Sequence, residues 1–271
     1  MAVKFIKQED IFTQKPTLMM YSYLMSFLVL IQLICDVVAL LTINISSIHL
    51  SASGVIFPIA FVLVGIIANI YGAERAKSVA IAMTMAQFIF CITVFIFASV
   101  KTNNTFNDNG VSQNFSAYFI KYWSVTSAGI LDTFIPLWIC SVLTSKCKKL
   151  FVCKTSKNAG VFYNFPIIGY FLSIFIPLCL SQLSLVLITY TINFGLGVGV
   201  SLSDLFNIIT STYIYKLCIG LLIALFLTRP LTKLCTYFDK IDTYDYGVSY
   251  NIFPKKGNTG VNVYVNKICQ N

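Results

Sequence analysis

The sequence contains one histidine, His49, and only 11% of its 271 residues are charged. With a single histidine an H-E-x-x-H zinc site is impossible, and His49, expected in a short outer loop, offers no plausible Ser-His-Asp triad. The nine cysteines include no C-x-x-C pair, and no glycine-rich phosphate loop is present. These absences predict a protein that is not an enzyme and that uses no cofactor and no metal.

Long apolar segments are what the sequence has instead. Hydrophobic residues make up 57% of the chain, and six runs approach or exceed the ~20 residues that cross a bilayer as a helix. The runs are residues 17–43, 53–71, 78–100, 122–143, 165–200 and 205–228. The sequence therefore predicts an all-α polytopic membrane protein, with six transmembrane helices in a domain of residues 17–237 between tails of residues 1–16 and 238–271.

The positive charges predict which way this domain lies in the membrane. Of the 19 Lys and Arg residues, 16 fall in the two tails and in the second and fourth connections. Arg75 and Lys77 are assigned to the second connection, whereas Lys101 and Lys121 lie on the opposite side. Cytoplasmic segments of membrane proteins carry such an excess, so both termini are expected in the cytoplasm and the protein in the cell inner (plasma) membrane.

Anionic lipid headgroups suffice as partners for these cations, so the net charge of +9 does not indicate nucleic-acid binding. Residues 101–117 are expected to form an outer loop, and His49 is expected in a short outer loop as well. The uncharged stretch 165–200 is long for one helix. A second span there would move the cationic tail outside, so one helix is preferred, running into a glycine-rich turn at residues 195–199. Assembly as a homo-oligomer is left open.

Three ionisable residues lie within the predicted spans: Asp36, Asp132 and Lys216. A charge in lipid costs several kcal/mol by insertion scales, and such residues usually face a partner or a cavity. Asp132 and Lys216 are expected near the bilayer midplane, where they could form a structural ion pair or contact a substrate. Asp36 lies nearer the outer end of its span. Asp132 and Asp36 are therefore the candidates for carrying a coupled proton.

A short internal similarity links two of the spans. Two serines three residues apart, followed five residues later by a polar side chain, occur in each span: Ser124, Ser127 and Asp132 in one, and Ser181, Ser184 and Thr189 in the other. Small hydroxyl residues are common in membrane helices because they allow close packing, so coincidence is one explanation. If the similarity reflects a repeat, Asp132 and Thr189 are equivalent positions.

Several motifs carry a resemblance to a known family. Residues 54–61 read Gly-Val-Ile-Phe-Pro-Ile-Ala-Phe, and residues 68–77 read Ala-Asn-Ile-Tyr-Gly-Ala-Glu-Arg-Ala-Lys. Further matches are the Ser-to-Asp segment at 127–132, Tyr213-x-x-Lys216 with Thr-Arg-Pro at 228–230, and the tail at 242–253, which begins Asp-Thr-Tyr-Asp-Tyr. This set resembles the queuosine-precursor transporter family, also called the vitamin-uptake-transporter family.

The resemblance implies an importer of a small nucleobase-like solute, a queuosine precursor of the 7-deazaguanine type. One carboxylate can accept the adjacent N–H donors of such a base, aromatic rings can stack on it, and neutral amides can supply further hydrogen bonds. The substrate-binding residues expected on this basis are Asp132, Lys216, Asn69, Tyr71, Phe57 and Gln182.

The chain also departs from the family pattern, because Gly65 and Asn69 stand where the family usually has two acids. This departure favours an alternative, a non-transporting membrane subunit or scaffold that kept the fold. A transporter of another vitamin-like solute is a third interpretation.

Overall fold

The computed structural model describes residues 18–38, 41–45, 48–99, 111–152, 166–195, 202–241 and 250–253. Six helices in these ranges are long and apolar enough to cross a membrane. They are α1 (Met19–Val37), α2 (Ala52–Tyr71), α3 (Ala73–Ser99), α4 (Val111–Phe151), α5 (Pro166–Gly195) and α6 (Leu202–Asp239). The predicted six-helix membrane architecture is confirmed.

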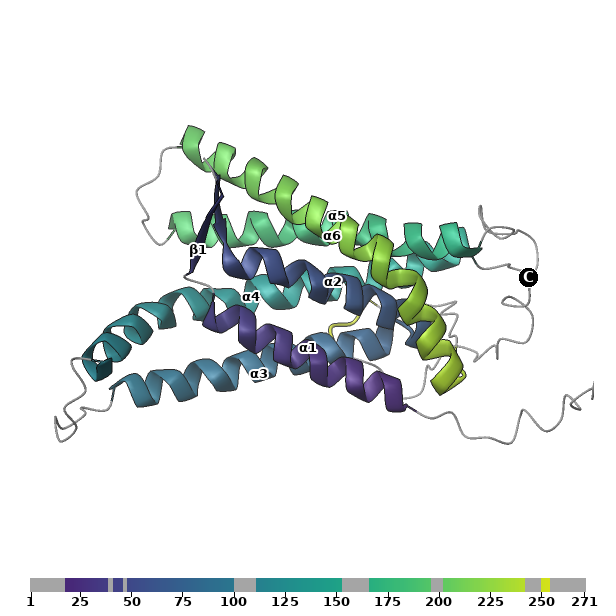
Figure 1. Cartoon of the computed structure of the whole chain (residues 1–271), viewed down its shortest axis with the longest axis horizontal. Coiled ribbons are helices and arrows are strands. Elements are labelled where there is room, and N and C mark those ends of the chain that lie inside the picture. The colour runs from purple at the N-terminus through teal and green to yellow at the C-terminus, as the bar shows by residue number, and fades with distance from the viewer. Residues whose placement is uncertain are drawn as a thin grey trace, which may run out of the picture.

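Helix α2 is the centre of the bundle (Figure 1). It packs against each of the other five helices, and these surround it in the order α1, α3, α4, α5, α6 and back to α1. Every residue from Ala60 to Tyr71 is buried. A helix that is apolar all round is expected in the middle of a bundle, where no face of it meets polar surroundings.

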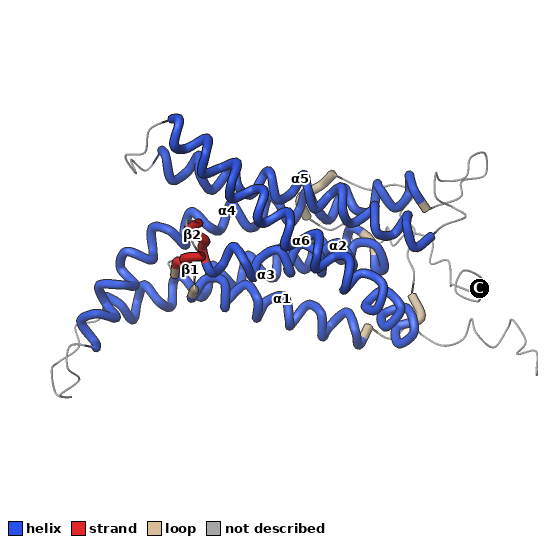
Figure 2. The backbone as a smooth tube through the Cα atoms, turned by 45° about the horizontal axis from the view of Figure 1, so that its top comes forward, coloured by secondary structure: helices blue, strands red, loops and turns tan. Residues whose placement is uncertain are grey.

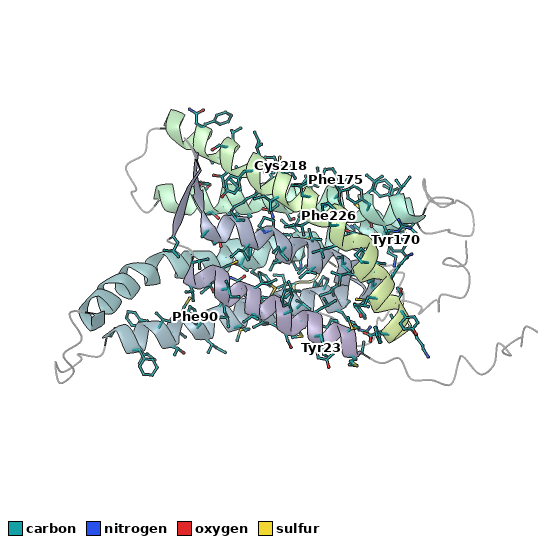
Figure 3. The ribbon with its side chains drawn as sticks, in the orientation of Figure 1. Tyr23, Phe90, Tyr170, Phe175, Cys218 and Phe226 are labelled. Carbon is teal, nitrogen blue, oxygen red and sulfur yellow. The ribbon has the colours of Figure 1, made fainter. Side chains whose placement is uncertain are left out.

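The outer helices present large apolar side chains to the outside. Tyr23 on α1 is 59% exposed and Phe226 on α6 is 77% exposed, and Figure 3 shows Tyr23 at the outer edge of the bundle. In water such a surface would associate or aggregate, whereas in a bilayer it faces lipid chains. The distribution of exposed side chains therefore agrees with the span lengths.

A two-stranded antiparallel hairpin adds a small feature to the helical fold. Strands β1 (Thr42–Ile45) and β2 (Ile48–Ser51) pair in the register Thr42↔Ser51 and link α1 to α2 at one end of the bundle, as Figure 2 shows in red. His49 was predicted to lie in a loop, but it belongs to β2 and pairs with Asn44. Pairing within a short connection satisfies backbone groups that an open loop would leave to solvent.

The turn between α2 and α3 consists of one residue, Gly72, with φ of 90°. This left-handed conformation is readily available to glycine, and here it reverses the chain directly after Tyr71. Arg75 and Lys77 were predicted to lie in a connection, but both belong to the first turns of α3. Lys77 is buried and forms an ion pair with Glu74 at 3.1 Å, which explains how the Lys77 charge is accommodated in the helix.

One other boundary differs from the prediction and one agrees. Helix α4 begins at Val111, so residues 111–117 and Lys121 are helical rather than parts of a loop. Polar residues there do not prevent a helix, because helix formation outside the hydrocarbon does not require apolar side chains. Stretch 165–200 contributes one helix, α5, as preferred. The glycine-rich turn lies outside the described residues except for Gly195, the last residue of α5.

The first residue of α1 and the last residue of α6 lie on the same side of the bundle. Helix α1 begins and α6 ends at the right of Figure 1, whereas the hairpin lies at the left. This is the arrangement that an even number of spans requires. The assignment of that side to the cytoplasm stays a prediction.

Candidate functional site

A cavity of about 240 Å³ lies between the helices, and all six helices line it. Ser53, Gly54 and Phe57 line it from the first turns of α2, so the cavity lies toward the end of the bundle that carries the hairpin. Functional sites in membrane proteins commonly lie between helices, where polar side chains are shielded from lipid. This cavity is therefore the candidate site.

The three ionisable residues predicted within the spans meet at this cavity. Asp36 comes from α1, Asp132 from α4 and Lys216 from α6, and each lines the cavity. Asp132 and Lys216 were considered as an ion pair, but their charged atoms are not in ion-pair contact, and each faces the same space. Two acidic side chains and one basic side chain therefore line the cavity.

Asp132 is held by the neighbouring helix. The hydroxyl of Thr189 on α5 donates to Asp132 Oδ2 at 2.6 Å, and the same hydroxyl lies 2.8 Å from the Leu185 carbonyl oxygen. Gly129 lies one turn before Asp132, and a Cβ there would lie 3.5 Å from Asp132 Oδ1. Asp132 and Thr189 are the two positions that the internal similarity made equivalent, and the bundle brings them into direct contact.

Asp36 is held by two amides from different helices. Gln32, one turn earlier on α1, donates Nε2 to Asp36 Oδ1 at 3.2 Å, and Gln87 on α3 donates Nε2 to the same atom at 3.0 Å. All three side chains are at most 5% exposed. Asp36 Oδ2 and the Oε1 atoms of Gln32 and Gln87 are buried without a hydrogen-bond partner. Three such oxygens at one cavity are unusual, because buried polar atoms are almost always paired.

Helix α6 approaches this region because α2 has a glycine there. A Cβ at Gly54 would overlap the Tyr215 hydroxyl and would lie 3.2 Å from Lys216 Cε. The absence of a side chain at Gly54 therefore leaves room for the side chains of Tyr215 and Lys216 to pass α2 and line the cavity. On the same helix, Phe57 lines the cavity and packs edge-on against Phe61, with ring centroids 5.3 Å apart. Phe57 thus supplies an aromatic wall beside the polar groups.

The other residues expected to bind substrate lie elsewhere. Phe57 and Tyr71 are 14 residues apart on one helix, about 21 Å at 1.5 Å per residue, so one small cavity cannot include both. The Tyr71 hydroxyl instead donates to Asp239 at 2.7 Å. Asn69 is fully buried, where its Oδ1 accepts from Ser173 at 3.0 Å. Gln182 is fully buried and is not among the residues that line the cavity.

The sequence-based prediction did not include Gln32 and Gln87. The available signal was the presence of an amide side chain in a long apolar run, which indicates a buried hydrogen-bonding role. No group of three or more His, Cys, Asp or Glu that could hold a metal ion occurs among the residues described by the structure.

Comparison with known proteins gives one match. No curated protein and no solved structure matches the chain. The model of the family described as "Putative vitamin uptake transporter" matches residues 51–229, a range that includes Phe57, Asp132 and Lys216 and excludes Asp36. The matched range is well over half of the 271 residues, and the chain belongs to the vitamin uptake transporter family.

Proposed function

We propose that this membrane transporter imports a small nucleobase-like solute, a queuosine precursor of the 7-deazaguanine type, across the cell inner membrane. The observation that carries the proposal is the cavity in which Asp36, Asp132 and Lys216 meet beside the ring of Phe57. A base of this type donates and accepts hydrogen bonds around its edge and has two apolar faces. The cavity offers partners for both properties.

The size of the cavity also favours a small solute. Its volume of about 240 Å³ is near the lower limit of small-molecule sites, ~300–1,000 Å³. A solute of one or two fused rings suits that space better than a large vitamin such as a corrinoid. The proposal assigns solute contacts to Asp132, Lys216, Phe57 and Asp36, and it leaves out Asn69, Tyr71 and Gln182.

The positions of Gly65 and Asn69, outside the cavity, weaken the scaffold alternative. A Cβ at Gly65 would meet Ile174 Cγ2 at 3.1 Å, and Asn69 bonds Ser173, so both positions pack against α5. Neither residue lines the cavity. The departure of these positions from the family pattern therefore removes no carboxylate from the candidate site, which retains Asp36 and Asp132.

Uptake of a labelled 7-deazaguanine base tests the proposal, in cells that can neither make nor salvage it. We expect the wild type to accumulate the base above the vector control, and we expect Asp132→Asn and Lys216→Met to reduce uptake at least tenfold. Lys233→Met is the matched control, because Lys233 is exposed on the same helix as Lys216. Wild-type protein that is present in the membrane without uptake would favour the scaffold alternative. Competition by unlabelled vitamins against uptake of the labelled base shows whether the protein transports another vitamin-like solute instead.

A further inference from the structure

The three unpartnered oxygens at Asp36 indicate which kind of group the cavity accepts at that end. Asp36 Oδ1 already receives both amide donors, so Asp36 Oδ2 and the two glutamine Oε1 atoms remain free to accept. Leaving a buried acceptor unpaired costs roughly 1–3 kcal/mol. A bound group that carries several N–H donors would satisfy these oxygens together.

The Asp132 end differs in this respect. Asp132 Oδ2 accepts from the Thr189 hydroxyl at 2.6 Å, and no atom of Asp132 is among the buried side-chain atoms that lack a partner. Lys216, on the facing helix α6, adds an ammonium donor to the same cavity. The Asp36 end of the cavity thus has three unpartnered acceptor oxygens, whereas the Asp132 end combines a paired carboxylate with an ammonium donor.

We infer that Asp36, positioned by Gln32 and Gln87, selects solutes by the exocyclic amino group of a 2-aminopyrimidinone ring. Such a ring places an amino group beside a ring N–H, and a carboxylate oxygen with neighbouring amide oxygens matches that row of donors. This inference rests on the proposed function and deepens it. It assigns amino-group recognition to Asp36, which precedes the family-matched range, and not to Asp132.

Two probes that differ by one group test the inference: 7-deazaguanine and 7-deazahypoxanthine, which lacks the amino group. Binding to the purified full chain in detergent is measured by calorimetry, and uptake is measured in parallel. Asp36→Asn is the sharpest variant, because the amide keeps an oxygen for Gln32 and Gln87 and converts the free acceptor into a donor. Gln87→Met removes a positioning bond, and Asp132→Asn is the comparison variant.

We expect the wild type to prefer 7-deazaguanine by roughly 10- to 100-fold, as hydrogen bonds to a charged group imply. Asp36→Asn should abolish this preference, Gln87→Met should reduce it, and Asp132→Asn should weaken binding of both probes while keeping their ratio. A ratio that responds to Asp132→Asn and not to Asp36→Asn would overturn the inference. Equal affinity of the wild type for the two probes, together with binding of sodium ions that is lost in Asp36→Asn, would overturn the inference as well.

The two readouts separate the inference from the proposed function. Uptake of both bases with an unchanged ratio in Asp36→Asn contradicts the inference alone. Binding with the expected ratios but without uptake supports the inference and contradicts the importer proposal. The absence of both binding and uptake contradicts both.

Discussion

Tyr71 and Asp239 join the last residue of α2 to the last residue of α6. The Tyr71 hydroxyl donates to Asp239 Oδ2 at 2.7 Å, although the two residues are 168 positions apart. The same carboxyl group accepts the backbone N–H groups of Met20 at 3.1 Å and Tyr21 at 3.2 Å. Asp239 therefore caps the N-terminus of α1, where Leu18 supplies no side-chain cap.

Removal of this hydroxyl should destabilise the bundle. Tyr71→Phe should lower the free energy of unfolding by about 1–3 kcal/mol, because a buried carboxyl group loses a donor. The measurement is the half-life of the detergent-solubilised protein at a fixed elevated temperature. Tyr237→Phe is the control, since Tyr237 is 76% exposed near the same helix end. Equal half-lives for the two variants would show that the Tyr71–Asp239 bond contributes nothing to stability.

A second prediction concerns the Thr189–Asp132 contact. Thr189→Val keeps the side-chain shape and removes the donor, so Asp132 loses its partner on α5. We expect solute binding to weaken at least fivefold, with a loss in stability of about 1–3 kcal/mol. Thr191→Val on the same helix should change neither quantity, because Thr191 is exposed and its hydroxyl bonds only the Leu187 carbonyl. Matching results for the two valine variants would contradict a role for the contact.

Asp132 and Lys216 should be coupled through the cavity without direct contact. Removing Lys216 alone leaves two carboxylates in one small space, whereas removing Asp132 as well relieves part of that repulsion. The double variant Asp132→Asn/Lys216→Met should therefore be more stable than the sum of the single effects predicts, by about 0.5–1 kcal/mol. A double-mutant cycle on thermal stability measures this coupling. Strict additivity would show that the two charges do not interact.

Two glycines on α2 should give different defects when changed to alanine. Gly54→Ala forces Tyr215 and Lys216 away from the cavity, so binding should fall at least tenfold. Gly65→Ala meets Ile174 outside the cavity, so it should lower stability and leave the affinity of the remaining folded protein unchanged. Calorimetry on each purified variant checks the affinity. An affinity loss in Gly65→Ala as large as in Gly54→Ala would contradict the assigned position of the site.

The orientation in the membrane is tested with reporters. A reporter fused after Asn271 should be cytoplasmic and one inserted near Asn109 should be external, because 16 of the 19 cations fall in the two tails and in the second and fourth connections. The same-side placement of the α1 start and the α6 end requires that both tails report the same compartment. External labelling of the C-terminal fusion would contradict the predicted orientation.

The helices could be predicted from the sequence because the length of an apolar run is a local property. The run of 36 residues at 165–200 needed only the charge rule to be assigned as one helix, and α5 agrees. The cluster of Asp36, Gln32 and Gln87 forms only where α1 and α3 pack together, since Gln87 and Asp36 are 51 residues apart. No local sequence pattern predicts that contact. Asn69 and Tyr71 were predicted because an amide can hydrogen-bond a base and an aromatic ring can stack on it, but the length of α2 separates them from the cavity.

The central position of α2 has a genetic consequence. Because this helix contacts all five others, a defect created on α2 has neighbours in every other span that can compensate for it. Second-site suppressors of an α2 substitution such as Gly65→Ala are therefore expected to be scattered over the whole sequence. Suppressors of a defect on an outer helix should instead fall in α2 and in the two helices beside it, so a suppressor map would reproduce the ring order α1, α3, α4, α5, α6.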